Sequence, residues 1–227
     1  MERPSPVESS NIAVSERDVS LPGSLVVPRH ATGVVVFAHD SGSSRLNPRD
    51  RAVARALNEC GLATLLFDLL TPEENGIDHL TGGLRFDIEL LSQRLVGAID
   101  WLGVRRETGR LPVGIFGSSI GAAAALRAAA ARPERVAAVI CRGGRPDLAG
   151  DDALGHVEAP TLLIVGGEDA PVIAANQAAG ANLHCVRRLD LVPGATHHFE
   201  EPGKLEQVAK LASEWFLRHM EKFDFSC

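Results

Sequence analysis

The sequence has little of what marks a membrane protein, a metal site or a nucleic-acid-binding surface. No apolar run reaches membrane-spanning length, and the N-terminal stretch lacks the long apolar segment of a signal peptide. The four cysteines are dispersed without a CxxC pair, and no HExxH motif occurs. Aromatic residues make up only 4%, and the arginines form no basic stripe interleaved with them. We therefore expect a cytoplasmic protein with free, mostly buried thiols and no membrane, nucleic-acid, metal or cofactor partner.

What is present favours one soluble α/β domain. The chain has 227 residues, 45% of them hydrophobic and 23% charged, with a formal net charge of −6. A chain of this length can bury most of its apolar surface in one core. No internal repeat, low-complexity linker or change of composition marks a boundary. The sequence therefore predicts a single domain over residues 1–227.

Short apolar runs alternate with amphipathic stretches. The apolar runs, rich in Val, Ile and Leu, lie near Leu25 and at 33–39, 62–68, 111–116, 135–141, 160–167 and 185–194. Such runs are typical of strands buried on both faces of a parallel sheet. Apolar residues at helical spacing occupy 49–61, 87–102 and 204–220. The alternation predicts a doubly wound, mostly parallel sheet with helices on both faces.

The longest stretch without strong periodicity is Leu69–Phe86, directly after the strand that ends near Asp68. We expect a loop there. Loops of this length in compact domains are often functional, and in open α/β sheets the site lies beyond the carboxyl ends of the strands. A plain surface loop is an equally good interpretation.

The segment GIFGSSIG contains a serine doublet, and glycine spacing separates its members. In the G-x-S-x-G pattern the nucleophile occupies a sharp turn between strand and helix, where the residues two before and two after must be small. Around Ser119 those residues are Gly117 and Gly121, whereas around Ser118 they are bulky. The apolar run before the turn and the alanine-rich stretch after it supply the strand and the helix. Ser119 is therefore the candidate nucleophile.

An acid and a histidine follow in the chain order typical of this arrangement, each again as a doublet. Asp169 and Glu168 come just after a strand, and Asp169 is preferred because it directly precedes the next helix. The histidine needed to accept and return the serine proton is His197 or His198. Neighbouring loop residues face opposite ways, so one of the two is expected in the site, but spacing alone does not choose between them.

The chain resembles the dienelactone hydrolase family of small α/β-hydrolases, in particular its serine-bearing members. The resemblance runs over nearly the whole chain, through VVVFAHDSGSSR, GIFGSSIGAAAAL, PTLLIVGGEDAPV and VPGATHHFEEPG. It implies an α/β-hydrolase fold and a carboxylic-ester-type hydrolase. The family motif GATHxFEEPG places the catalytic histidine directly after the threonine, which indicates His197, and the aspartate of GGxD agrees with Asp169. The dienelactone hydrolases proper use cysteine where this chain has Ser119.

The same resemblance implies that the backbone amides of Ile120 and Ser41 form the oxyanion hole. Many serine relatives carry glycine where this chain has Asp40, and a carboxylate facing inward would repel a developing oxyanion. We hypothesise that Asp40 instead pairs with an arginine near a strand end. The candidates, which would also favour a substrate bearing a carboxylate, are Arg45, Arg85, Arg142 and Arg145.

The spacing of the later strands limits the size of the substrate. Fewer than about twenty residues separate the apolar run at 135–141 from that at 160–167, too few for a cap domain. A shallow site of this kind suits a small-molecule acyl substrate such as an ester, thioester or lactone. Acyl transfer by the same residues and a non-catalytic binding or regulatory protein on the same scaffold are the alternatives. The sequence also leaves open whether the chain forms a homodimer.

Overall fold

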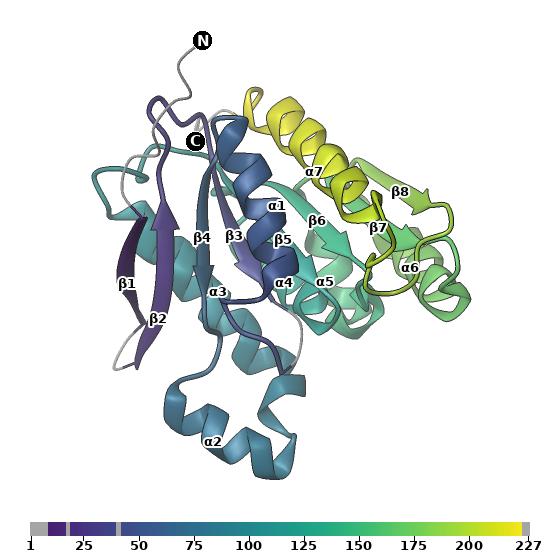
Figure 1. The fold of residues 1–227 in the computed structure, drawn as a ribbon, viewed down its shortest axis with the longest axis horizontal. Coiled ribbons are helices and arrows are strands. Elements are labelled where there is room, and N and C mark those ends of the chain that lie inside the picture. Colours follow the sequence, from purple (N-terminus) through teal and green to yellow (C-terminus); the bar gives the residue numbers. More distant parts are fainter. Residues whose placement is uncertain (1–8, 17–18, 40–41, 224–227) are drawn as a thin grey trace.

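An eight-stranded sheet forms the centre of the computed structural model, which describes residues 9–16, 19–39 and 42–223 (Figure 1). The strand order is β1-β2-β4-β3-β5-β6-β7-β8. The pairs β1/β2 and β2/β4 are antiparallel, and all other pairs are parallel. The strands are β1 Ser9–Glu16, β2 Val19–Val26, β3 Val34–Ala38, β4 Ala63–Phe67, β5 Val113–Ser118, β6 Val136–Arg142, β7 Thr161–Gly166 and β8 Arg187–Val192.

Burial along the strands follows their position in the sheet. Every residue of β3, β4, β5, β6 and β7 is buried, as their continuous apolar runs predict for strands covered on both faces. The same prediction is wrong for β2, whose side chains alternate between buried and partly exposed, and for the edge strand β8, where only Val192 is buried. An edge strand lacks a neighbour on one side, so solvent reaches it.

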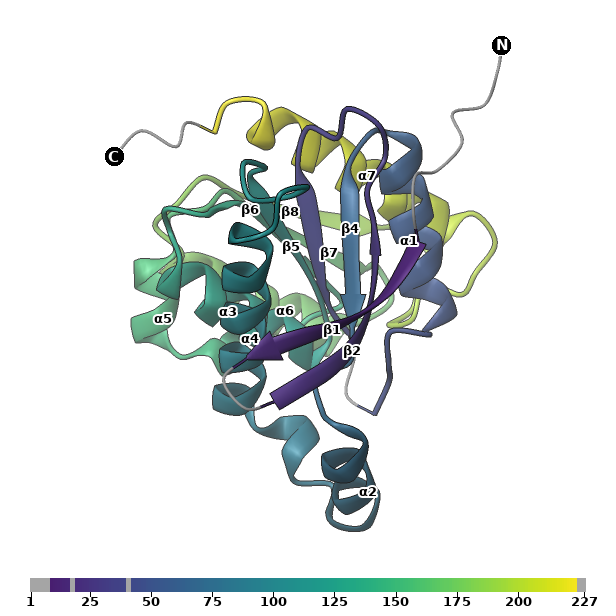
Figure 2. The ribbon, with the colours of Figure 1, turned by 90° about the vertical axis from the view of Figure 1, so that its left-hand side faces the viewer.

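Helices cover both faces of the sheet, which confirms the doubly wound architecture. Helices α1 and α7 pack on one face, and α3, α4, α5 and α6 on the other (Figure 2). Only a 3-10 helix at Pro146–Ala149 and the short α5 lie between β6 and β7, so no cap domain is inserted there. The helices are α1 Pro48–Glu59, α2 Pro72–Thr81, α3 Ile88–Gly103, α4 Ile120–Ala131, α5 Asp151–His156, α6 Ala170–Asn182 and α7 Lys204–Met220.

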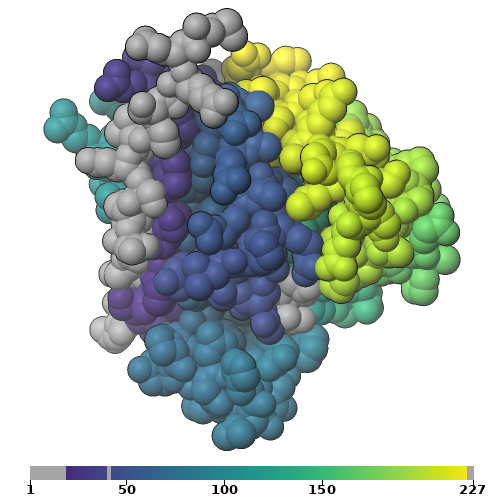
Figure 3. All heavy atoms as spheres, viewed as in Figure 1, coloured from purple at the N-terminus to yellow at the C-terminus, as the bar shows by residue number. Residues whose placement is uncertain are grey.

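The segment 69–86 is not the loop that we expected, because most of it forms α2. Thr71 caps the helix by accepting the backbone N–H of Glu74, whose carboxylate accepts the N–H of Thr71, and Pro72 occupies the first turn. The helix protrudes from the body of the protein below α1 (Figure 3). Its side chains Ile77 and Leu80 are exposed, so no apolar stripe packs on a core. That is why periodicity does not reveal the helix, although the capping residues do.

Within the described part of the chain, no helix is both long enough and apolar enough to cross a membrane.

Candidate active site

Ser119 occupies a strained turn between β5 and α4. Its backbone has φ 51° and ψ −120°, a conformation that L residues rarely adopt outside functional sites. The two flanking glycines make this turn sterically feasible. A Cβ on Gly117 would lie 2.7 Å from the Cα of Ala122, and one on Gly121 would overlap the carbonyl oxygen of Ala38. The turn therefore has the geometry that the glycine spacing around Ser119 predicts.

The other member of the serine doublet points away from this turn. Ser118 is the last residue of β5 and only 1% exposed, and its Oγ donates to Oδ1 of Asp50 at 3.4 Å. Ser119 is half-buried. Because neighbouring residues at the end of a strand face opposite sides of the sheet, only one serine of the pair is presented at the turn.

We expect Gly121→Ala to destroy this turn. The added methyl group meets backbone atoms of β3 that cannot move without disrupting the sheet, so the variant should lose at least about 3 kcal/mol of stability or fail to fold. Gly76→Ala is the matched control, since nothing lies within 4 Å of the added Cβ on the exposed face of α2. It should gain about 0.5–1 kcal/mol. Chemical denaturation of both variants measures the difference, and equal stabilities would contradict the steric argument.

Asp169 and His197 are in direct contact. Nδ1 of His197 lies 2.7 Å from Oδ2 of Asp169, which is the N-cap residue of α6. An ionised carboxylate only accepts hydrogen bonds, so the contact places the histidine proton on Nδ1 and leaves Nε2 as the proton acceptor. Glu168 is exposed, and so is His198, whose ring meets that of His197 edge-on with 4.9 Å between centroids. Of the acidic doublet and the histidine doublet, the two residues in contact are therefore Asp169 and His197.

Backbone and side-chain contacts hold the loop that carries His197. The Glu168 N–H donates to the carbonyl of Ala195 at 3.0 Å, joining this loop to the one that carries Asp169. Oε1 of Glu201 accepts from both the N–H and the hydroxyl of Thr196, at 3.1 and 2.6 Å. These hydrogen bonds lower the pKa of Glu201 and thereby favour its charged form. Phe199, with a positive φ of 56°, buries its ring in the core and anchors the loop from below.

The loop after β6 lies between Ser119 and His197. The N–H of Ser119 donates to the carbonyl of Arg142 at 3.2 Å. The next residue, Gly143, has φ 51° and lies against His197, because a Cβ there would be 3.1 Å from the His197 carbonyl oxygen. The serine and the histidine therefore flank one short loop at the carboxyl end of the sheet.

Of the two predicted oxyanion-hole residues, one can be located. Ile120 is the first residue of α4, where backbone N–H groups point out of the helix and carry the positive end of its dipole. Ser41 lies outside the described residues, and so does Asp40 with its hypothesised ion pair. Both therefore stay predictions from the sequence.

The four candidate arginines each contact another carboxylate. Arg45 pairs with Asp68 at 2.5 Å, Arg85 with Asp78 at 2.7 Å, Arg142 with Asp50 at 3.5 Å, and Arg145 with Asp147 at 2.7 Å. Arg142 ends β6, at a strand end as predicted, but it is only 4% exposed and therefore lies beneath the surface.

The pair between Arg85 and Asp78 combines backbone and side-chain hydrogen bonds. Arg85 donates to Asp78 from its backbone N–H at 3.0 Å and from Nε at 2.7 Å. Burial acts to raise the pKa of Asp78, but the hydrogen bonds and charge of Arg85 outweigh it and leave that pKa lowered. Arg85 also lies close to Gly42, in the loop after β3. Much of its charge is therefore already balanced within the protein.

Among the described residues, no group of three or more His, Cys, Asp or Glu side chains is arranged to hold a metal ion.

The fold and the site together define a class of protein. The sheet is doubly wound, and a strained serine turn follows one of its central strands. An aspartate and a histidine, which are in contact, come later in the chain and follow later strands. This is the arrangement of α/β-hydrolases. Comparison with known families agrees, because residues 21–225 match the dienelactone hydrolase family. The chain therefore belongs to the dienelactone hydrolase family.

Solved structures support the same classification. A dienelactone hydrolase from Anabaena variabilis is 57% identical, with a TM-score of 0.92 over 96% of this chain and 100% of that one. Est1E from Butyrivibrio proteoclasticus is 18% identical, with a TM-score of 0.78 over 94% of this chain and 100% of that one. The second likeness is one of fold alone.

The curated relatives are longer proteins. A protein of Mycobacterium tuberculosis, provisionally named a phosphoribosyl transferase, is 54% identical over 215 residues, which cover 95% of this chain and 47% of the relative. The chain thus spans about half the length of the curated relatives that it matches. The name describes the whole of that longer protein.

Proposed function

We propose that this protein is a serine hydrolase that cleaves a small ester, thioester or lactone through a Ser119-His197-Asp169 triad. The observation that carries the proposal is the 2.7 Å contact between His197 and Asp169, which lie across the loop after β6 from the strained turn of Ser119. An aspartate bound to Nδ1 holds the histidine in the tautomer that can accept a serine proton. The longer mycobacterial relatives carry a different name, but the contact between His197 and Asp169 supports acyl chemistry.

In the proposed reaction, His197 Nε2 removes the proton of the Ser119 hydroxyl as its oxygen attacks the acyl carbonyl. The tetrahedral oxyanion is stabilised by the backbone N–H of Ile120, at the N-terminus of α4, and by that of Ser41. His197 then protonates the leaving group, which departs and leaves an acyl group on Ser119. Water, deprotonated by His197, releases the acid and regenerates the serine.

The substrate is proposed to be small and not necessarily charged. The short connection between β6 and β7 provides no cap over the site. The arginines offer weak support for a carboxylate on the substrate, because Arg45 and Arg85 each already pair with an aspartate. Acyl transfer to an alcohol or thiol would use the same residues, and analysis of the products distinguishes it from hydrolysis.

Covalent labelling with a fluorophosphonate tests the proposal. We expect one adduct per chain by intact mass, located on Ser119 by peptide mapping, and none on Ser119→Ala or on heat-denatured protein. Labelling would then be followed by hydrolysis assays on small acyl esters and lactones. A folded wild-type chain that stays unlabelled, under conditions that label a control hydrolase, would contradict the proposal and favour the non-catalytic alternative.

Thiol alkylation should leave this activity intact, although dienelactone hydrolases proper use a cysteine. Burial raises the pKa of Cys141 far above its ordinary value and also raises that of Cys185, so neither thiol ionises readily. Cys60 is exposed, contrary to our expectation of mostly buried thiols. At about pH 8, iodoacetamide should modify Cys60 first, because it is exposed, and should spare the buried Cys141. If labelling of Ser119 were lost in proportion to alkylation of Cys141, the prediction would be wrong. Peptide mapping distinguishes these cysteines from Cys227, which lies outside the described residues.

A further inference from the structure

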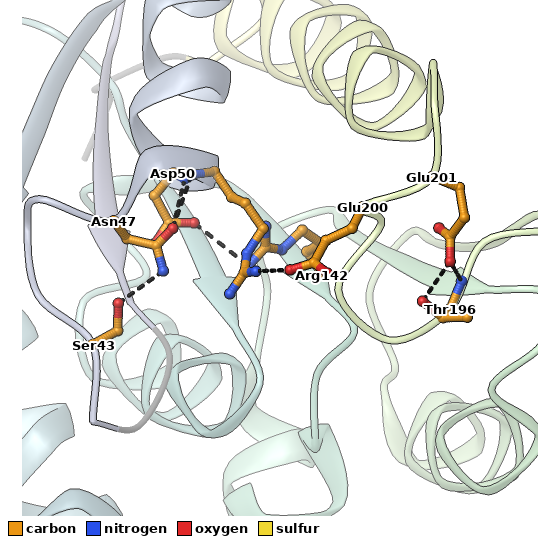
Figure 4. A network of polar contacts seen from close by, with 8 residues as sticks. Ser43, Asn47, Asp50, Arg142, Thr196, Glu200 and Glu201 are labelled. Atoms are coloured by element: carbon orange, nitrogen blue, oxygen red, sulfur yellow. Dashed lines mark hydrogen bonds and ion pairs between the residues drawn. The ribbon is translucent and has the colours of Figure 1, made fainter.

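The first turn of α1 carries an acidic residue in an unusual place. Asp50 is 1% exposed, although an acid in the first turn of a helix ordinarily lies in solvent and interacts with the helix dipole. The side chain of Asn47 caps this turn by accepting the N–H groups of Arg49 and Asp50, and it donates to the Ser43 hydroxyl at 2.8 Å. Figure 4 shows Asp50 and Arg142 directed toward one another behind the capped turn.

Asp50 joins the ends of two neighbouring strands. Its Oδ1 accepts the hydroxyl of Ser118, the last residue of β5, at 3.4 Å. The same oxygen lies 3.5 Å from Nη2 of Arg142, the last residue of β6, which is 4% exposed. Both distances are long, but charges buried at this depth interact through protein and not through water, so their attraction is weakly screened.

Both residues held by Asp50 also touch the proposed triad. Ser118 directly precedes Ser119 in the chain, and the carbonyl of Arg142 accepts the N–H of Ser119 at 3.2 Å. After Arg142 comes Gly143, which lies against His197. The carboxylate of Asp50 therefore contacts the ends of both strands, and these strand ends adjoin the serine and the histidine.

A second contact from the same helical turn reaches the histidine loop independently. Nη1 of Arg49 lies 2.6 Å from Oε1 of Glu200, three residues after His197. The first turn of α1 is thus tied to both sides of the triad, to the serine side through Asp50 and to the histidine side through Arg49.

Stability alone is a weak reason for this buried pair. Moving two charges out of water is costly, and apolar residues of similar volume often stabilise a core as well or better. What a buried pair supplies more readily is one defined arrangement of the groups around it. Ser118 and Arg142 both contact Asp50, and both also adjoin the serine turn, Ser118 through the chain and Arg142 through its carbonyl.

We propose that Asp50 is a positioning residue of the active site, which holds the ends of β5 and β6 so that Ser119 and His197 keep their reactive separation. The proposal rests on the proposed function. It implies that loss of the carboxylate slows the reaction of Ser119 without changing which residue reacts.

The test compares fluorophosphonate labelling rates of variants well below the Tm of each. Asp50→Asn should label on Ser119 about ten- to a hundredfold more slowly than wild type, as expected for a small misplacement of reacting groups. On p-nitrophenyl acetate, kcat should fall by a similar factor with little change in KM. Asp100→Asn is the matched control, because it also removes the carboxylate that pairs with an arginine, here Arg132. Asp100 lies on α3 in an exposed ion pair, so the labelling rate of this variant should equal that of wild type.

Two further variants separate positioning from stability. Asp50→Asn combined with Arg142→Gln removes both charges, so no uncompensated charge stays buried and Tm should recover toward wild type. The labelling rate should stay low if Asp50 positions the strand ends, and it should recover with Tm if the pair is merely structural. Should Asp50→Asn not fold, Ser118→Ala removes only the hydroxyl contact to Asp50 and should still slow labelling several-fold.

The outcomes distinguish this role from the proposed function. A wild-type chain that is never labelled would overturn the proposed function and this role together. If the wild type is labelled, and Asp50→Asn or the double variant reacts at the wild-type rate, only the role of Asp50 would be overturned and the proposed function would stand. If Asp50→Asn does not fold, a wild-type labelling rate for Ser118→Ala would likewise overturn the role of Asp50.

Discussion

His197→Ala is expected to lower kcat for ester hydrolysis by about 10²- to 10⁴-fold, the usual contribution of a general base and acid. The variant loses the imidazole that contacts Asp169. Without a base, the serine hydroxyl stays protonated near neutral pH and is a poor nucleophile. Initial-rate kinetics on a small acyl ester, together with the fluorophosphonate labelling rate, measure the effect.

His198→Ala is the matched control for that experiment. The two histidines are adjacent and their rings touch, but His198 is exposed, while His197 contacts Asp169. We expect the kcat of His198→Ala to stay within about threefold of the wild-type value, because His198 is exposed and lies outside the proposed triad. A larger loss in His198→Ala than in His197→Ala would mean that the loop rearranges during the reaction and that His198 is the base.

Asp169→Asn is expected to lower kcat by about 10³- to 10⁴-fold while leaving the fold intact. An amide NH₂ group at this position donates to Nδ1 of His197, so the proton of the imidazole moves to Nε2 and the nitrogen facing the serine can no longer accept one. Kinetics on the same ester measure the loss, and circular dichroism shows that the variant is folded.

Glu168→Gln is the corresponding control. Glu168 precedes Asp169 but its side chain is exposed, so neutralising it should change kcat by less than about twofold. Wild-type activity in Asp169→Asn would exclude Asp169 as the triad acid, and a large loss in Glu168→Gln would assign that role to its neighbour.

Much of the fold is predictable because its signals are local. The apolar runs that become β3 to β7 are buried strands, as their composition predicts, and the helical patterns at 49–61, 87–102 and 204–220 correspond closely to α1, α3 and α7. The local signal for α2 is also present, as the capping box of Thr71 and Glu74 with Pro72 between them. We missed that helix because hydrophobic periodicity, the stronger signal elsewhere, is absent from a helix that does not pack on the core.

The surroundings of Asp50 were not predictable in the same way. In the sequence it is an ordinary acid in the first turn of a helix, a position that usually favours solvent. Its side chain is buried where it meets the last residues of β5 and β6, Ser118 and Arg142, which are distant from it in the chain. Nothing near Asp50 in the sequence indicates either contact.

The sequence by itself determined which of Ser118 and Ser119 occupies the turn, because that choice is steric and local. The turn accepts no side chain two residues before or after its serine, so the glycines at 117 and 121 specify Ser119 before any tertiary contact is known. The choice between His197 and His198 is different, since residue spacing leaves both possible and only the family resemblance favoured the first. Only the tertiary structure shows which of them contacts Asp169, because a hydrogen bond between residues far apart in the chain depends on how β7 and β8 bring their loops together.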